Sequence, residues 1–158
     1  MRLFLNLIIM ENLEFGQYYH IYNRGNNRER LFYEPWNYSH FMDLYVKYIH
    51  PIAETYAYCL LGNHFHFLIR IKEKDELSEL NLDQRPLWRY FADFFNSYAK
   101  LVNLKYHRTG SLFQERYRRK KVYSEKYLSQ LVLYIHWNPV KHNLSDKYEN
   151  YPYSSYRA

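Results

Sequence analysis

A β-hairpin is the feature that most limits how this chain can fold. Residues 55–61 and 64–71 are two apolar and aromatic runs, and only the turn signal Gly62-Asn63 separates them. Side chains alternate along a strand, so the second run has an apolar face and a mixed face. The mixed face holds His64, His66, Leu68 and Arg70, and the apolar face, expected in the core, holds Phe65, Phe67, Ile69 and Ile71.

The other elements follow from periodicity and from turn signals. Apolar residues that recur every three or four positions predict helices. Ser124 is expected to cap the last helix and Pro139 to end it, because proline disfavours the helical conformation in the residue before it. The remaining strands are expected at 18–24 and 118–122, and the helices at 37–50, 87–106 and 124–138. This order favours an α+β fold, a ferredoxin-like sandwich with a mainly antiparallel sheet.

The length of 158 residues fits one domain. We assign residues 16–156 to that domain and residues 1–15 to an N-terminal extension. The apolar start, residues 1–10, is too short to span a bilayer and is followed by no small-residue cleavage site, so we expect no membrane contact. Met10 is a second possible start. A single Cys rules out a disulfide framework and fits a reducing compartment, most simply the cytoplasm.

Positive charge is concentrated in one segment, residues 105–121. Seven cations and one acid there give +6, which equals the net charge of the whole chain. Aromatic residues lie among these cations, a combination that suits single-stranded nucleic acid, although a solvated basic loop has the same composition. Residues 73–83 instead carry an excess of acidic side chains, and we expect this segment to be a solvent-exposed loop.

His64 and His66 are candidate metal ligands. Two imidazoles two residues apart on one face of a strand can bind the same divalent ion. The pattern is short and weak by itself, and two histidines on a partly exposed sheet face explain it equally well.

Tyr134 lies on a face of the last expected helix that need not belong to the core. Asn138 lies four residues later and therefore on the same helical face, away from the apolar stripe that contains Leu131 and Ile135. The chain has 20 tyrosines, so any one of them is expected to be structural unless a further signal singles it out.

Four motifs in order resemble a known family. LGNHFH at residues 61–66 looks like the HUH motif of the single-tyrosine transposases of insertion sequences, and YIHWNPVK at 134–141 looks like their tyrosine helix. YHIYNRG at 19–25 resembles their first strand. RTGSLFQERY at 108–117 resembles a stretch of the branch called REP-associated tyrosine transposases. The resemblance covers about residues 16–156.

The resemblance implies an HUH endonuclease-like fold and a metal-dependent transposase that cleaves and rejoins single-stranded DNA at hairpin ends. Tyr134 would be the nucleophile, and His64, His66 and Asn138 would hold Mg²⁺ or Mn²⁺. The family often has Gln at the third ligand position, and Asn is one methylene shorter. The cations expected to contact DNA are Arg24, Arg108, Arg116, Arg118, Arg119, Lys120 and Lys121.

The chemistry is physically reasonable for these groups. A phenol with an ordinary pKa of about 10 is only ~0.1% ionised at neutral pH, and a nearby metal ion offsets part of that cost. Attack on DNA would give a 5′-phosphotyrosine whose bond energy serves the later rejoining. Two alternatives stay open: a domesticated, non-catalytic protein that binds hairpin DNA, and a nuclease that uses water. Both a homodimer and a monomer fit the resemblance.

Overall fold

The expected hairpin forms half of a four-stranded antiparallel sheet. The computed structural model describes residues 11–158, and its strand order is β2-β3-β1-β4. The strands are β1 (Tyr18–Arg24), β2 (Ala53–Leu61), β3 (His64–Ile71) and β4 (Arg118–Lys121). All three neighbouring pairs run antiparallel. This order, with two helical crossovers, is the ferredoxin-like arrangement that the sequence predicts.

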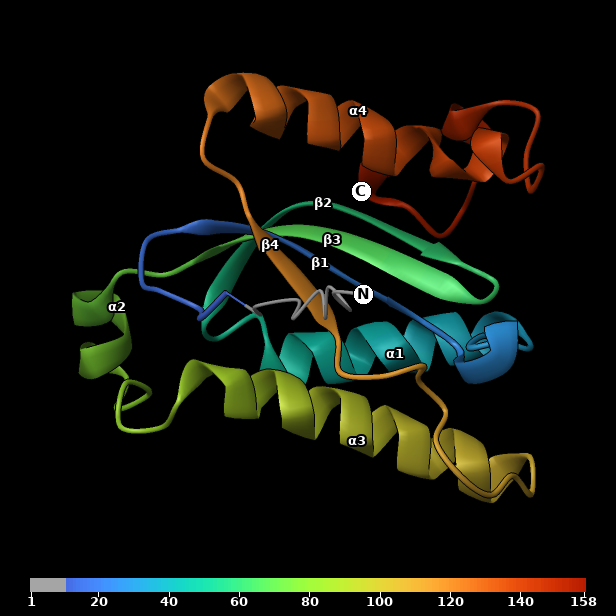
Figure 1. The fold of residues 1–158 in the computed structure, drawn as a ribbon, viewed down its shortest axis with the longest axis horizontal. Helices are drawn as coiled ribbons and strands as arrows, with labels where there is room; N and C mark the ends of the chain where they lie inside the picture. The colour runs from blue at the N-terminus through green and yellow to red at the C-terminus, as the bar shows by residue number, and fades with distance from the viewer. Residues whose placement is uncertain (1–10) are drawn as a thin grey trace, which may run out of the picture.

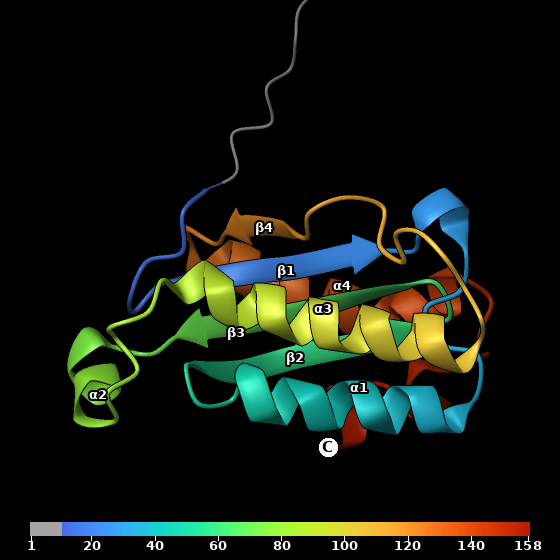
Figure 2. The same ribbon diagram turned by 90° about the horizontal axis from the view of Figure 1, so that it is seen from below.

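Helices cover both faces of the sheet (Figure 1). α1 and α3 lie on one face, and α4 lies on the other, so the molecule has three layers; Figure 2 shows the sheet from the side of α1 and α3. The helices are α1 (Pro35–Tyr48), α2 (Lys74–Glu79), α3 (Leu87–Lys105) and α4 (Glu125–Lys141). Short 3₁₀ turns occur at Asn26–Arg28, Tyr148–Asn150 and Ser155–Arg157.

The main core is aromatic and lies between the sheet and the α1/α3 layer. Phe65 and Phe67 of β3 are buried there, as their alternation predicts, and Phe41 of α1 and Phe94 of α3 pack with them. Tyr98 is fully buried in the same core, and its hydroxyl donates to the Leu31 carbonyl at 2.6 Å. Tyr98 is therefore a structural tyrosine.

A smaller core holds α4 against the opposite face. Leu131 and Ile135 of α4 are buried with Cys59 of β2 and Leu68 of β3. These residues recur at helical spacing on α4 and at alternate positions on the strands, so one stripe of the helix faces one face of the sheet. This contact fixes the height and rotation of α4 above the sheet.

The acidic run that we expected to be a loop contains helix α2, so that expectation is wrong. Glu73 and Glu76 form a capping box, in which each side chain accepts from a backbone N–H at the start of the helix. Leu77 is fully buried against the main core. Acidic residues are favourable in the first turn of a helix, because they face its free N–H groups.

Pro139 does not end the last helix, contrary to expectation. α4 runs through Pro139 to Lys141, and Asn138 stays within the helix. Proline removes one N–H, but the following turn keeps its bonds: the His142 N–H donates to the Asn138 carbonyl at 3.0 Å and the Leu144 N–H to the Pro139 carbonyl at 2.8 Å. Pro139 is also buried, which offsets part of the lost bond.

Residues 11–15, which the sequence assigns to an extension, pack against the edge of the sheet. The carboxylate of Glu11 accepts from the Lys121 backbone N–H, and the Tyr19 hydroxyl donates to the Asn12 carbonyl at 2.9 Å. The expectations about residues 1–10 fall outside the described part of the chain. No helix within residues 11–158 is long and apolar enough to cross a membrane.

Candidate active site

The two histidines of the HFH motif lie on the α4-facing side of β3. The antiparallel register places His66 opposite Tyr22 and His64 opposite Arg24 on β1. Neighbours across a sheet share a face. The rings of His64 and His66 are 5.4 Å apart, centroid to centroid, and nearly perpendicular, at 88°.

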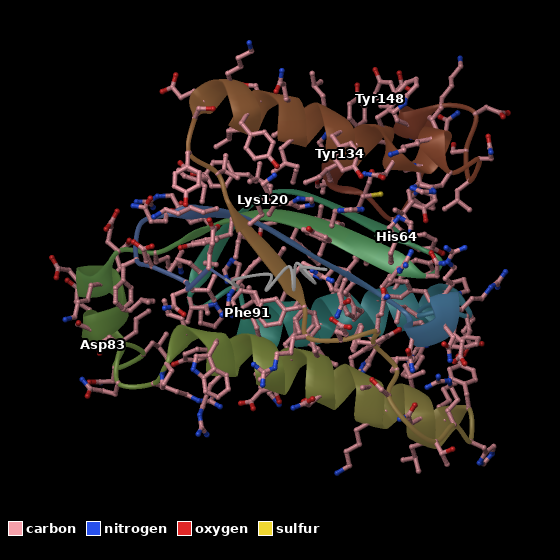
Figure 3. All side chains as sticks on the ribbon, in the orientation of Figure 1. His64, Asp83, Phe91, Lys120, Tyr134 and Tyr148 are labelled. Carbon is pink, nitrogen blue, oxygen red and sulfur yellow. The ribbon has the colours of Figure 1, made fainter. Side chains whose placement is uncertain are left out.

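Tyr134 reaches this site from α4. Its ring meets the His66 ring edge-on, with 5.6 Å between centroids and 82° between planes. Tyr134 keeps 38% of its surface exposed, unlike the structural Tyr98. Figure 3 shows Tyr134 above the sheet, between Lys120 and His64 in that view. The sequence predicted that Tyr134 and the histidines belong to one site, and one chain alone brings them together.

Asn138 lies one turn after Tyr134 and is completely buried. Its amide Nδ2 donates to the Tyr134 backbone carbonyl at 2.9 Å, which fixes the orientation of the amide. Its Oδ1 is buried and has no hydrogen-bond partner among residues 11–158. Buried polar atoms are nearly always paired, so this free acceptor needs an explanation.

Each histidine of the HFH motif has a hydrogen-bonding neighbour at Nδ1. His64 Nδ1 lies 2.7 Å from the Asn63 side-chain oxygen, and His66 Nδ1 lies 2.9 Å from His20 Nε2. Asn63 occupies the hairpin turn, as predicted, and in addition holds His64. In both histidines the atom that remains for another ligand is Nε2.

The histidines of the site are held in the neutral form. Burial lowers the pKa of His64 to about 4, and the nearby His142, Arg24 and Lys141 add to that effect. Burial also lowers the pKa of His66 well below its ordinary value. Neutral imidazole is the form that binds metal, because its unprotonated nitrogen carries the lone pair.

The donor set fits a divalent ion. Within residues 11–158 no three His, Cys, Asp or Glu side chains gather as a metal-binding group. The remaining candidate donors are the two imidazole nitrogens of His64 and His66 and, one turn after Tyr134 on α4, the unpartnered amide oxygen of Asn138. Such a set leaves coordination positions for phosphate oxygens, and hard oxygen ligands together with imidazole suit Mg²⁺ or Mn²⁺.

Three of the predicted DNA-contacting cations lie beside this site. Lys120 is opposite His20 on β1, and Arg118 is opposite Tyr22, so both belong to the face that carries the histidines. Arg24 lies at the other end, opposite His64, and its Nε donates to Gln114 at 2.6 Å. Arg118 has one weak ion pair, 3.9 Å from Glu115.

Three other predicted cations have intramolecular partners. Arg108 pairs with Glu29 and also bonds Asn103. Arg119 donates to backbone and side-chain oxygens on the opposite face of the sheet, and the Lys121 ammonium lies 3.1 Å from Glu14. Their assignment to DNA stays a prediction that the geometry does not favour.

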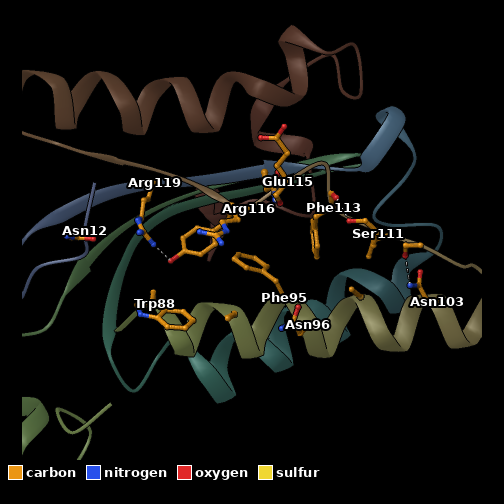
Figure 4. Close-up of a pocket in the computed structure, with 16 residues that line it drawn as sticks. Asn12, Trp88, Phe95, Asn96, Asn103, Ser111, Phe113, Glu115, Arg116 and Arg119 are labelled. Carbon is orange, nitrogen blue, oxygen red and sulfur yellow. Dashed lines mark hydrogen bonds between the residues drawn. The ribbon is translucent and has the colours of Figure 1, made fainter. Parts of the chain in front are cut away.

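Arg116 lines a cavity on the opposite face of the sheet (Figure 4). The cavity of about 770 Å³ lies between α3 and the segment before β4, and Trp88, Phe95 and Tyr117 contribute to its walls. Phe95 and Tyr117 belong to the main core, on the side of the sheet away from His66. The cavity is therefore separate from the histidine and tyrosine site.

His20 and His142 complete a histidine cluster that sequence reasoning did not assign to the site. His20 bonds His66, and the His142 ring lies 4.7 Å from that of His64. His20 belongs to the YHIYNRG motif, which is the signal that points to it. The sequence alone does not place His20 beside His66, because that contact depends on the register between β1 and β3.

Comparisons with known proteins agree with this arrangement. No protein-family model matches the chain. A curated protein of Haemophilus influenzae, named as a REP-associated tyrosine transposase, is 28% identical over 109 residues. The match covers 68% of this chain and 61% of that relative, less than two thirds of its length.

The fold is also that of a solved protein. The structure of a REP-associated tyrosine transposase bound to a REP hairpin matches 93% of this chain and 80% of its own, with a TM-score of 0.70 and 20% sequence identity. The comparisons thus confirm both the fold class and the resemblance to REP-associated tyrosine transposases that the four motifs indicate.

Proposed function

We propose that this chain is a metal-dependent transposase or nickase that cleaves one DNA strand at hairpin ends and rejoins it through a covalent bond to Tyr134. The observation that carries the proposal is the approach of the partly exposed Tyr134 ring to His66. The similarity to a relative solved with a REP hairpin supports hairpin DNA as the partner.

In the cleavage step the Tyr134 oxygen attacks the phosphorus of the scissile phosphate. A bond from phosphorus to the tyrosine oxygen forms, and the bond from phosphorus to the 3′-oxygen breaks. The phenol proton passes to water at the open side of the site, and the leaving 3′-oxygen takes a proton and becomes a hydroxyl. A later 3′-hydroxyl reverses the step, so rejoining needs no further energy source.

His64, His66 and Asn138 are the residues that would hold Mg²⁺ or Mn²⁺. When bound, such an ion polarises the scissile phosphate and stabilises the negative charge of the phenolate. The protein keeps both imidazoles neutral by burial and leaves the Asn138 oxygen unpaired. These ligands add no negative charge, so a bound ion stays strongly electrophilic.

Arg118, Lys120 and Arg24 would hold the phosphates on either side of the cleaved bond. They lie on the sheet face that carries the histidines, and basic side chains are the main source of affinity for nucleic acids. Because one chain supplies both Tyr134 and the histidines, a single subunit contains all the groups that the reaction needs.

The test uses a hairpin oligonucleotide with single-stranded flanks, taken from a palindrome that borders the gene, in the presence of Mn²⁺. Attack by tyrosine leaves the fragment downstream of the cut attached to the protein. A label at the 3′ end should therefore migrate with the denatured protein, and a label at the 5′ end should appear on a free fragment with a 3′-hydroxyl.

The two alternatives give different patterns. A hydrolytic nuclease would release both labelled fragments, and a non-catalytic hairpin-binding protein would retain intact DNA only under native conditions. Either pattern would overturn the proposal.

A further inference from the structure

His20 contacts the candidate metal site through His66. Its Nε2 lies 2.9 Å from Nδ1 of His66, and both side chains are 7% exposed. The two rings lie nearly parallel, 5.1 Å apart between centroids. His20 is in turn stacked on Tyr22, at 4.5 Å, so its own ring is held in place.

The hydrogen bond has two possible directions, and they have opposite consequences. A neutral imidazole carries one N–H, so one ring must donate and the other must accept. If His20 donates, the proton of His66 sits on Nε2, and that nitrogen has no lone pair for an ion. If His66 donates from Nδ1, its Nε2 lone pair is free.

His64 shows which direction the site uses. Its Nδ1 faces the Asn63 side-chain oxygen at 2.7 Å, and an amide oxygen accepts but does not donate. His64 therefore carries its proton on Nδ1 and presents Nε2. A matching pair of ligands requires the same tautomer in His66, with His20 as the acceptor.

We propose that His20 is a positioning residue that accepts the Nδ1–H of His66 and so directs the His66 Nε2 lone pair toward the metal ion. This inference rests on the proposed function, because it assigns a ligand role to His66. The role assigned to His20 is to position His66 and not to bind the ion. Such outer partners fix both the tautomer and the ring orientation of a histidine ligand.

The decisive comparison is between His20→Phe and His20→Gln. Phenylalanine keeps a flat ring next to Tyr22 but has no acceptor, and the glutamine side chain places an amide oxygen near the position of the lost Nε2. Mn²⁺ affinity of the full chain without DNA, measured by electron paramagnetic resonance, should fall about 10- to 100-fold in His20→Phe. His20→Gln should recover most of that loss.

His50→Phe is the matched control, because His50 is exposed at the end of α1, outside the site. It should bind Mn²⁺ as the unaltered protein does. Unchanged affinity in His20→Phe, or equal losses in the Phe and Gln variants, would overturn the inference.

A second measurement needs no variant and covers the case in which His20→Phe does not fold. Long-range ¹⁵N–¹H NMR correlations of the metal-free protein report which ring nitrogen carries the proton. We expect protonated Nδ1 in His66, and protonated Nε2 would contradict the inference.

The outcomes separate the inference from the proposed function. If the protein forms a covalent DNA adduct but the Mn²⁺ affinity is unchanged in His20→Phe, the inference about His20 is wrong and the proposed function stands. If the Mn²⁺ affinity falls in His20→Phe but no covalent DNA adduct forms, the inference about His20 stands and the proposed function is wrong.

Discussion

The ring of Tyr134 stands edge-on to the imidazole of His66, with 5.6 Å between their centroids. The two residues are far apart in sequence, and a small apolar core brings them together. Leu131 and Ile135 anchor α4 on the sheet, and Tyr134 lies next to Ile135 on the helix. The candidate active site is thus a consequence of how one helix face packs.

Asn138 should contribute to metal binding at the expense of stability. Its buried Oδ1 has no partner within residues 11–158, and an unpaired buried acceptor costs about 1–3 kcal/mol. We expect the near-isosteric Asn138→Leu to be at least as stable as the unaltered protein without metal. Mn²⁺ should raise the melting temperature of the unaltered protein but not that of Asn138→Leu.

Calorimetric melting of both proteins, with and without Mn²⁺, measures this difference. Equal stabilisation of the two by Mn²⁺ would show that the Asn138 oxygen is not a ligand.

The cations of β4 should separate into two functional groups. Arg118 and Lys120 face the histidine side, whereas the side chains of Arg119 and Lys121 are held by intramolecular partners. Arg118→Ala and Lys120→Ala should each weaken DNA binding and reduce the slope of log affinity against log salt concentration by about 0.7 per lost single-strand contact. Arg119→Ala and Lys121→Ala should mainly lower stability.

Fluorescence titration of a labelled hairpin at several salt concentrations provides the slopes. The same slope change in all four variants would mean that alternation along β4 does not decide which cations contact DNA.

Stability without metal should rise with pH through the weakly acidic range. Burial, with a smaller effect of Lys120, lowers the pKa of His20 to about 4 from its ordinary value of 6.5. Between these values the unfolded chain binds more protons than the folded chain, so a falling pH favours unfolding. The buried neutral His20 therefore makes its full contribution to the free energy of unfolding above about pH 6.5. This contribution, about 3 kcal/mol for a pKa shift of this size, is lost as the pH falls toward 4.

Urea unfolding across this range should show the trend, and His20→Gln should reduce its slope because one titrating group is removed. His64, whose pKa is also lowered to about 4, should supply part of the remaining slope. A stability that does not change between neutral pH and pH 5 would contradict the assignment of buried neutral histidines.

The sequence predicted most of the fold because its signals were local. Alternation gave β3 its bounds of His64–Ile71, and the Gly62-Asn63 turn fixed the hairpin. The two segments that the sequence predicted wrongly, α2 and the end of α4, depend on tertiary packing as well as on local signals. α2 forms because Leu77 is buried, and α4 continues past Pro139 because the surrounding turn keeps its bonds.

The site was predictable only in part. Strand alternation pointed to His64 and His66, but their grouping with Tyr134 came from the resemblance, since no helical or strand period relates residues so distant in sequence. The contact between His20 and His66 depends on the register of β1 against β3, and a shift of one residue would place His20 on the other face. The partners of Arg119 and Lys121 likewise depend on residues 11–14, which the sequence assigned to an extension.

If Tyr134 is the group that becomes attached to DNA, two tyrosine variants of α4 should differ in adduct formation. Tyr134→Phe should bind the labelled hairpin as the unaltered protein does but form no adduct that survives denaturation with Mn²⁺. Tyr127→Phe, on the same helix nearly two turns away, should form the adduct normally. An adduct in Tyr134→Phe at the ordinary level would show that another residue is the nucleophile.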